Sequence, residues 1–324
     1  MVTIQNNNPL AGIKCAVALG NFDGVHKGHA TLIRKTVALS REYGLSSCVY
    51  TFSEHPSNFK NGFYGIITDN SEKQSIIESL GADIFYLDDF DKVKDLSCEE
   101  FCRDILVKKL GAEIAVCGKN YRFGKNREGD CETLKKQMEA LGKKTVIIDY
   151  VTADSHGTGE AINSTSIRRC ISEGETEKAA ELMGRPFSIC YPVIYGRQLG
   201  RKLGFPTINQ KFPKEKLRPK NGVYACLCTI DGKEYPGVAN VGTKPTVTAG
   251  ESKPPVLCET HIIGYDGDLY GKRIKLDFYR RLRDEKKFSD LDELTRAVKS
   301  NIEETKKYFE EKKGKGILYN EKKR

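Results

Sequence analysis

The stretch from Leu19 to His29 restricts the fold of this chain more than any other part of the sequence. It follows an apolar run, Ala16–Leu19, which indicates a buried strand. After it, residues recur at the spacing of one helix face: Leu32, Ile33, Thr36, Val37 and Leu39. A strand that leads through a glycine-rich turn into a helix is typical of an α/β domain.

The turn itself has the composition of a phosphate site. Gly20, Gly24 and Gly28 remove side chains where the backbone turns tightly or where a ligand approaches. His26 and His29 are three residues apart, so both point to the same side of a helix. Unpaired N–H groups at a helix start bind phosphate, and two imidazoles can stabilise charge on a transferring phosphoryl group. The turn therefore predicts a nucleoside triphosphate site.

This segment also resembles a known signature. It is similar to the HxGH motif of nucleotidylyltransferases, in the GxFDGxHxGH form that is typical of prokaryotic bifunctional riboflavin kinase/FAD synthetases. The resemblance implies that His26 and His29 are catalytic. It also implies that the residues before them bind ATP, namely Gly20, Asn21, Phe22, Asp23 and Gly24.

Strand-like and helical segments alternate through the first half of the chain, after a polar lead-in over residues 1–13. Such alternation predicts a parallel sheet with helices on both faces, here a Rossmann-like nucleotidylyltransferase domain. Ligands of such sheets bind at the carboxyl ends of the strands. The expected strands are 16–19, 47–52, 83–87, 114–117 and 145–151, and the expected helices are 72–80, 98–110, 132–141, 164–173 and 175–183.

Two loops that follow expected strands resemble the flavin-binding segments of the same family. Thr51–Pro56 is similar to its TFxPHP segment, with Glu54 where a proline is usual, and implies a flavin-binding role for His55. The alternative is that His55 is a loop residue that only hydrogen-bonds to the backbone of its own loop. Gly118–Asp130 resembles a second family loop.

In that second loop, the resemblance assigns Asn120 and Phe123 to the flavin site of the adenylyltransferase. An asparagine can donate and accept hydrogen bonds at a ribose or flavin edge, and a phenylalanine offers a flat apolar surface. The basic residues of the loop are as well explained by a solvated loop as by phosphate binding; they are Arg122, Lys125 and Arg127.

The segment Ile162–Arg168 opens another expected helix. Ser and Thr at a helix start are ordinary capping residues. The segment also resembles the ISSTxIR motif that grips the ATP phosphates in nucleotidylyltransferases, with Asn163 in place of the first serine. The resemblance assigns Ser164, Thr165 and Arg168 to ATP binding.

The composition changes at Gly184-Arg185-Pro186, where glycine and proline together mark a boundary. Expected strands then follow one another without helices, over 187–195, 222–230, 234–241, 256–264 and 273–282, and a long helix follows over 289–309. This order predicts an antiparallel β-barrel or sandwich, of which we take the barrel, with a C-terminal helix. The predicted domains are 1–183 and 187–310, followed by a basic tail over 311–324.

The second domain has a phosphate loop of its own. Backbone can approach phosphate at Gly196, Gly200 and Gly204, beside the charges of Arg201 and Lys202. Thr207 and Asn209 are two residues apart, so they face the same way on an extended segment, and their oxygens suit Mg²⁺. The segment resembles the GxxLGFPTxN motif of riboflavin kinases, which implies that Gly196, Gly200, Lys202, Gly204, Thr207 and Asn209 bind Mg–ATP. A basic β-turn is the alternative.

Strand alternation places Glu259 and His261 on the same face. A carboxylate there can accept a proton from an attacking hydroxyl, and the segment resembles the ExH segment of riboflavin kinases, whose Glu is the proposed base. Arg281–Phe288 also fits that family. It implies that Arg281 and Arg283 bind flavin or phosphate, without distinguishing between them.

The composition limits where such a protein works. The 324 residues suffice for two domains. No apolar run approaches the about 20 residues that cross a bilayer, and the N-terminus lacks the pattern of a signal peptide. Eleven cysteines occur without the CxxC pairs of a zinc site. We therefore expect a cytoplasmic protein, in whose reducing surroundings free thiols persist.

The resemblance as a whole predicts a bifunctional enzyme that phosphorylates riboflavin to FMN and adenylylates FMN to FAD. Its implied cofactor is Mg²⁺, and its partners are the small molecules ATP, riboflavin and FMN. We expect it to bind neither nucleic acid nor a membrane, and weak self-association is possible. An aminoacyl-tRNA synthetase would need a KMSKS-like loop, which is not present. A nucleic-acid-binding protein would cluster its charge, whereas the net charge of +9 is dispersed.

Overall fold

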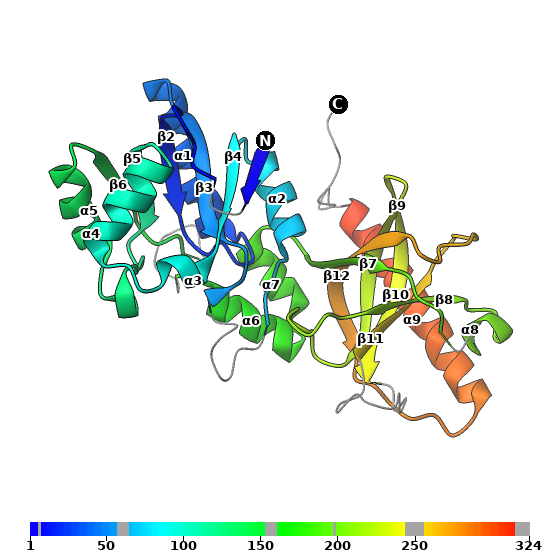
Figure 1. Cartoon of the computed structure of the whole chain (residues 1–324). Helices are drawn as coiled ribbons and strands as arrows, with labels where there is room; N and C mark the ends of the chain where they lie inside the picture. Colours follow the sequence, from blue (N-terminus) through cyan, green and yellow to red (C-terminus); the bar gives the residue numbers. More distant parts are fainter. Residues whose placement is uncertain (6–7, 57–64, 153–160, 197–198, 244–255, 315–324) are drawn as a thin grey trace. The chain divides into compact units, whose positions relative to one another are not determined.

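The computed structural model describes residues 1–5, 8–56, 65–152, 161–196, 199–243 and 256–314. The chain divides into two compact units, Met1–Ser166 and Ile167–Arg324. The division falls inside a single helix, α6 (Ser164–Glu173), which begins in the first unit and continues into the second (Figure 1). The two units are described separately.

The first unit contains a six-stranded parallel sheet, which confirms the predicted α/β class. Its strand order is β1-β4-β3-β2-β5-β6. The strands are β1 (Val2–Gln5), β2 (Cys15–Leu19), β3 (Ser46–Phe52), β4 (Ile84–Asp88), β5 (Ala112–Gly118) and β6 (Lys144–Ile148). The expectation of a polar lead-in over residues 1–13 was wrong for β1, which pairs with β4 as an edge strand. A four-residue strand between polar residues leaves little periodicity to detect.

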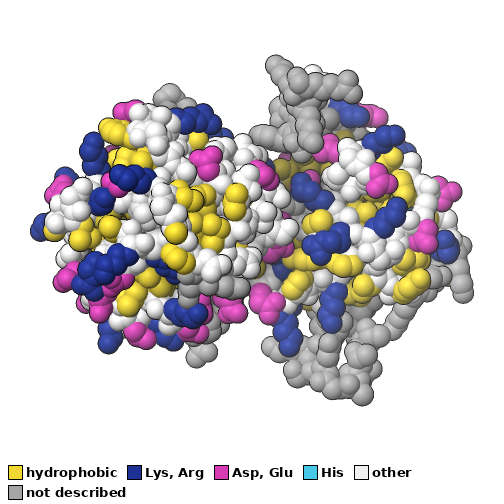
Figure 2. Space-filling model, turned by 45° about the horizontal axis from the view of Figure 1, so that its top comes forward, with side chains coloured by type: hydrophobic (Ala, Val, Ile, Leu, Met, Phe, Trp, Pro, Cys, Tyr) yellow, Lys and Arg dark blue, Asp and Glu magenta, His cyan; other side chains and the backbone are white. Residues whose placement is uncertain are grey.

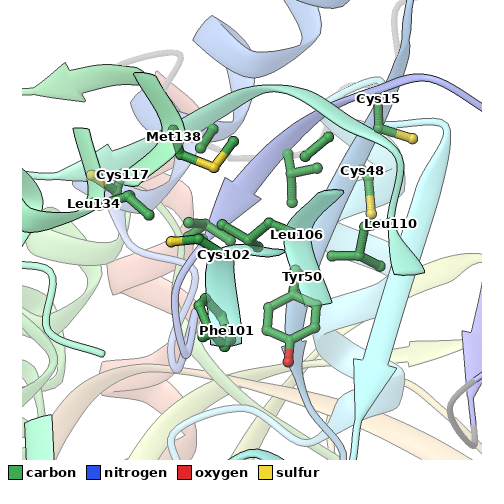
Figure 3. Packing of buried hydrophobic residues seen from close by; sticks show 14 of the residues in the cluster. Cys15, Cys48, Tyr50, Phe101, Cys102, Leu106, Leu110, Cys117, Leu134 and Met138 are labelled. Atoms are coloured by element: carbon green, nitrogen blue, oxygen red, sulfur yellow. The ribbon is translucent and has the colours of Figure 1, made fainter. Parts of the chain in front are cut away.

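Helices cover both faces of this sheet, as expected (Figure 1). Alternate residues of β2 enter two different cores: Val17 packs with Leu106 and Met138, whereas Ala18 packs with Ile33 and Val37. Figure 3 shows the first of these cores. The helices are α1 (Lys27–Tyr43), α2 (Asn70–Ser79), α3 (Phe90–Val93), α4 (Cys98–Glu100), the π-helix η2 (Phe101–Lys109), the short 3-10 helix η3 (Lys125–Arg127) and α5 (Cys131–Ala140).

A buried ion pair joins the end of β4 to the π-helix η2. The Nζ atom of Lys109 lies 2.8 and 2.9 Å from the two carboxylate oxygens of Asp88, whose side chain is 0% exposed. The Tyr50 hydroxyl donates to the same carboxylate at 2.7 Å. Removing one partner leaves the other charge buried and unpaired, which costs far more than the intact pair contributes.

We therefore expect Lys109→Met to destabilise the first unit by about 3–5 kcal/mol. The neighbouring change Lys108→Met is a matched control, because the Lys108 side chain is 66% exposed and pairs with Asp104 on the surface. Urea unfolding followed by circular dichroism measures both variants. Equal unfolding midpoints for the two would contradict the expectation.

The second unit contains a six-stranded antiparallel sheet of order β7-β12-β9-β10-β11-β8. An antiparallel bridge between Ile194 and Asn209 joins the chain after β7 to β8, so the two ends of the sheet meet. This curled sheet and its long C-terminal helix confirm the predicted barrel. The elements are β7 (Phe187–Pro192), α8 (Leu199–Lys202), β8 (Thr207–Lys211), β9 (Gly222–Ile230), β10 (Lys233–Thr243), β11 (Val256–Ile262), β12 (Arg273–Arg283) and α9 (Leu291–Gly314).

Helix α7 (Thr176–Met183) packs on strand β12 of this second unit. The Thr176 hydroxyl donates to the Tyr279 carbonyl at 2.9 Å, and Glu177 accepts from Arg280 at 3.2 Å. The sequence placed this helix at the end of the first domain. The compact units thus divide at 166/167, earlier in the chain than the change in composition at Gly184.

The surface carries both signs of charge. On the face drawn in Figure 2, Lys and Arg side chains alternate with Asp and Glu side chains. Within the part of the chain that the structure describes, no helix is both long enough and apolar enough to span a bilayer.

Candidate active sites

The turn after β2 brings the two predicted catalytic histidines together. His26 is the N-cap of α1, and its Nδ1 accepts a hydrogen bond from the His29 backbone N–H at 3.3 Å. The proton of a neutral His26 ring therefore lies on Nε2. The two imidazoles stack with their centroids 3.6 Å apart, and the Phe22 ring meets His29 edge-on at 5.2 Å.

Two glycines of this turn make room for these rings. A Cβ on Gly20 would lie 3.1 Å from the Phe22 ring, and one on Gly28 would lie 3.2 Å from the His26 ring. The sequence analysis explained these glycines by a tight backbone turn or by the approach of a ligand. The structure gives them a packing reason as well, because the aromatic rings occupy the space that a side chain would fill.

The residues between Gly20 and His26 differ in what they offer a ligand. Asn21 is exposed, and its carbonyl accepts from the Thr51 hydroxyl at 3.0 Å. Asp23 is 1% exposed, and its carboxylate accepts from the Ile67 and Thr68 backbone N–H groups at 2.9 and 3.1 Å. The Asp23 side chain, which the resemblance assigned to ATP, is thus committed to contacts inside the protein.

The predicted triphosphate helix begins beside this turn. The Ser164 hydroxyl donates to the Asp23 carbonyl at 2.9 Å. Asn163 accepts from the Ser166 backbone N–H at 2.8 Å, so it caps the helix in place of Ser164 or Thr165. Thr165 is exposed, and Arg168 lies one turn further along the same helix.

The three predicted flavin residues of the first unit lie in loops after strands. His55 follows β3 and is partly buried, and Asn120 follows β5 and is exposed. Phe123 is only 6% exposed, and its ring packs against Phe101 at 5.5 Å and stacks with Tyr121 at 5.8 Å. Phe123 therefore has a clear part in the core, while its predicted contact with flavin remains a prediction.

In the second unit, a cavity of about 250 Å³ opens on the barrel. Strand register lines up its polar residues: Glu259 on β11 stands opposite Asn209 on β8 and Asn240 on β10. His261 stands opposite Thr207 in the same way, and its Nδ1 donates to the Pro206 carbonyl at 2.9 Å. The structure thus brings Thr207, Asn209 and Glu259 together, although they come from separate parts of the sequence.

Asn209 has an oxygen that suits a cation. Its side chain is 5% exposed, and its Oδ1 has no hydrogen-bond partner among the described residues. The described residues hold no group of three or more His, Cys, Asp and Glu side chains that could bind a metal ion. Mg²⁺ is usually bound through one or two carboxylates together with substrate phosphates and water. The Asn209 oxygen could add a neutral ligand to such a set, in a cavity that the carboxylate of Glu259 also lines.

The glycine-rich loop before β8 contacts this site at several points. A Cβ on Gly196 would lie 2.4 Å from the Asn209 amide, and Gly200 lines the 250 Å³ cavity. Gly204 has a φ of +80°, which a side chain would strain. The side chain of Lys202 lies outside the described residues. Thr207 also borders a second cavity of about 120 Å³, together with Arg201.

The structure separates the two arginines that the sequence could not distinguish. Arg283 lines the 250 Å³ cavity, and burial lowers the pKa of its guanidinium. Arg281 instead donates to the Asn221 carbonyl at 2.9 Å and packs on the turn at Gly174, where a Cβ would lie 2.4 Å from its Cδ atom. A register shift on β12 between the two residues turns them apart.

The sequence interpretation missed several residues of this cavity. Asn240 lines it, as do Leu294, Thr295, Val298 and Asn301 from α9. Glu285, Lys286 and Phe288 line it too; they belong to the segment Arg281–Phe288 that fits the family, but no role was assigned to any of the three. No sequence motif marks the α9 residues, because they line the cavity only through the way this helix packs on the barrel.

Comparisons with known proteins assign a family to each part of the chain. Residues 10–165 match the FAD synthetase family and residues 183–309 match the riboflavin kinase family. The chain is 32% identical over 300 residues to the bifunctional riboflavin kinase/FMN adenylyltransferase of Bacillus subtilis (strain 168), which covers 91% of this chain and 93% of the relative. The chain belongs to the bifunctional riboflavin kinase/FMN adenylyltransferase family. The enzyme of that name from Escherichia coli (strain K12) is 31% identical over 300 residues, 91% of this chain and 93% of the relative.

A solved structure has the same fold over most of the chain. It is titled a macrolide-efflux protein from Streptococcus pneumoniae, with a TM-score of 0.83, 29% identity and coverage of 94% of this chain and 99% of that one. The likeness extends over both family segments. The family membership shows that the chain converts riboflavin to FMN and FMN to FAD, with ATP as the second substrate of each step.

Proposed function

We propose that the second unit phosphorylates riboflavin in the 250 Å³ cavity and that Glu259 is the general base. The observation that carries this proposal is the register that places Glu259 opposite Asn209. In this mechanism the Glu259 carboxylate takes the proton of the ribityl 5′-hydroxyl while the oxygen of that hydroxyl attacks the γ-phosphorus of ATP. ADP leaves and FMN is formed.

Thr207 and Asn209 would hold a Mg²⁺ ion through the Thr207 hydroxyl and the buried Asn209 Oδ1. When bound, the ion supplies positive charge that neutralises the phosphates. We place the ATP phosphates along the loop that carries Gly196, Gly200 and Gly204, since backbone can approach them there; Lys202 belongs to the same predicted set. The 120 Å³ cavity on the other side of Thr207 supports a nucleotide at this end of the site.

Adenylylation is proposed for the turn after β2. The FMN phosphate would attack the α-phosphorus of ATP and expel pyrophosphate, so no covalent enzyme intermediate is needed. His26 and His29 would stabilise the charge on the reacting phosphorus. The helix that begins at Ser164 would bind the triphosphate through Thr165 and Arg168. We keep 1–183 and 187–310 as the proposed functional domains, although the compact units divide at 166/167 and helix α7 packs on strand β12.

The two arginines of β12 offer a matched test of the kinase cavity. We expect Arg283→Ala to raise the KM for riboflavin by about 10-fold or more, because a buried charge-assisted contact is worth about 1.5–3 kcal/mol. Arg281→Ala should lower the unfolding midpoint of the second unit and leave that KM nearly unchanged. Steady-state kinetics of both variants decide the assignment, and a larger KM effect for Arg281→Ala would reverse it.

The proposed pair of reactions is tested most directly by incubating the purified chain with riboflavin, ATP and Mg²⁺ and separating the flavins by chromatography. FMN should accumulate first and FAD should follow. Omitting Mg²⁺ should stop FMN formation. Formation of FMN without any FAD would contradict the proposal that adenylylation takes place at the turn after β2.

The cysteines support a reducing compartment. All eleven are free thiols, and ten of them are buried. Burial raises the pKa of the Cys117 thiol to about 12, so its reactive thiolate form is rare. We propose on this ground a cytoplasmic enzyme whose partners are its small-molecule substrates.

A further inference from the structure

The backbone of the turn after β2 is strained on both sides of Asp23. Phe22 has a φ of +48° and Val25 a φ of +33°, and both side chains are buried. A β-branched residue with positive φ is a genuine outlier. Such conformations persist only where the surrounding structure holds them, and they are concentrated at functional sites.

Contacts from Ile67 and Thr68, which are 44 or 45 positions later in the chain, hold this turn. The Asp23 carboxylate accepts from the Ile67 N–H at 2.9 Å and from the Thr68 N–H at 3.1 Å. The Thr68 hydroxyl accepts from the Gly24 N–H at 2.9 Å and lies 3.5 Å from the Asp23 carboxylate. Asp23 and Thr68 are 1% and 4% exposed, so these bonds are shielded from water.

A buried lysine, Lys73, lies on the helix that follows this loop. It is 4% exposed on α2, one turn after the helix begins at Asn70. Burial lowers the pKa of its ammonium, and the negative charges of Asp23 and Asp69 act in the opposite direction.

The held turn positions three groups of the adenylyl-transfer site. Phe22 presents its ring edge to His29, and the helix starts at His26 immediately after Val25. The Asp23 carbonyl accepts from the hydroxyl of Ser164, at the start of the triphosphate helix. Releasing the turn would therefore move both histidines and loosen the contact to Ser164.

We propose that Asp23 and Thr68 are positioning residues of FMN adenylylation, which act by holding the Phe22–Val25 turn in its strained conformation. Neither side chain touches substrate in this assignment. It replaces direct ATP binding by the Asp23 side chain, and it rests on the proposed placement of adenylylation at this turn. A misplacement of reacting groups by about 1 Å can cost about 100-fold in rate.

A matched pair at Thr68 tests the proposal. Thr68→Val keeps the shape but removes the hydroxyl, and it should lower the kcat of FMN adenylylation by about 10- to 100-fold. The KM for ATP should change much less. Thr68→Ser keeps the hydroxyl and should retain most of the wild-type rate. The riboflavin kinase rate of the same chain is the internal control for both variants.

Asp23→Asn is the second variant, because it weakens the hydrogen bonds between Asp23 and the Ile67–Thr68 loop, which together we call the clamp. In the double variant, the effects of Asp23→Asn and Thr68→Val on kcat should be less than additive, since both changes release the same turn. An increase in the KM for ATP with unchanged kcat would instead make Asp23 a ligand of ATP and overturn the proposal. Equal rates for Thr68→Val and Thr68→Ser would also overturn it.

A second readout does not depend on activity. In protein labelled with ¹³C-histidine, Thr68→Val should shift or broaden the His26 and His29 resonances, and Thr68→Ser should leave them in place. Unchanged resonances in Thr68→Val would refute the clamp even if the rate fell. Failure of the proposed function would look different: His29→Ala would then keep full FAD synthesis, and adenylylation would not take place at this turn.

Discussion

Replacing Glu259 by Gln should abolish most riboflavin phosphorylation and leave FAD synthesis from supplied FMN unchanged. The change keeps the size of the side chain and removes its ability to take a proton. General base catalysis contributes about 10²–10⁴-fold, so kcat for FMN formation should fall within that range. The KM for riboflavin should change little, since the glutamine still fills the same place opposite Asn209.

Glu234 provides the matched control for this change. It is an exposed carboxylate on β10, the strand that pairs with β11, and it does not line the cavity. Glu234→Gln should retain the full rate of both reactions. Discontinuous assays with riboflavin and with FMN as separate substrates measure the two activities in each variant. A Glu259→Gln enzyme with a kinase rate near that of wild type would remove the general base from the mechanism.

The motifs were readable from the sequence because each is local. The segment from Gly20 to His29 has its glycines and histidines within ten residues, and it links β2 to the start of α1, as predicted. Thr207 and Asn209 likewise needed only an extended backbone to face the same way, which β8 supplies. Short-range periodicity therefore sufficed for the fold class, while the roles of the site residues stay predictions.

What the sequence could not supply depends on pairing between distant segments. Asn240 enters the kinase cavity because β10 and β11 pair in one register, and a slip by one residue would turn it away. Arg281 and Arg283 are two apart and would share a face on a regular strand. The irregular register of β12 separates them, and no residue pattern signals that shift.

The role of Asp23 also could not be read from the sequence. The family motif includes it, and a motif does not say whether a carboxylate faces a ligand or the protein. Its acceptors are used by Ile67 and Thr68, which lie in a loop with no motif of its own. The internal role of Asp23 becomes visible only when that loop is folded onto the turn.

Replacing His29 by Ala should remove FAD synthesis and leave riboflavin phosphorylation intact. The imidazole of His29 stacks on His26 at the helix start, where preorganised donors stabilise developing negative charge. Loss of one such donor costs about 10²–10³-fold in kcat. The backbone N–H of His29, which donates to His26, is retained by alanine, so the capping bond of α1 should survive.

The contrast with Thr68→Val separates chemistry from positioning at this turn. In the proposed mechanism His29 acts on the reacting phosphorus, so the effect of His29→Ala should fall on kcat and should not be rescued by any change at Thr68. If His29→Ala and Thr68→Val were each severe but fully additive, the histidine and the clamp would act independently. A combined effect smaller than the sum of the two is expected, because His29→Ala already removes one of the groups that the released turn would misplace, while His26 and the contact to Ser164 remain.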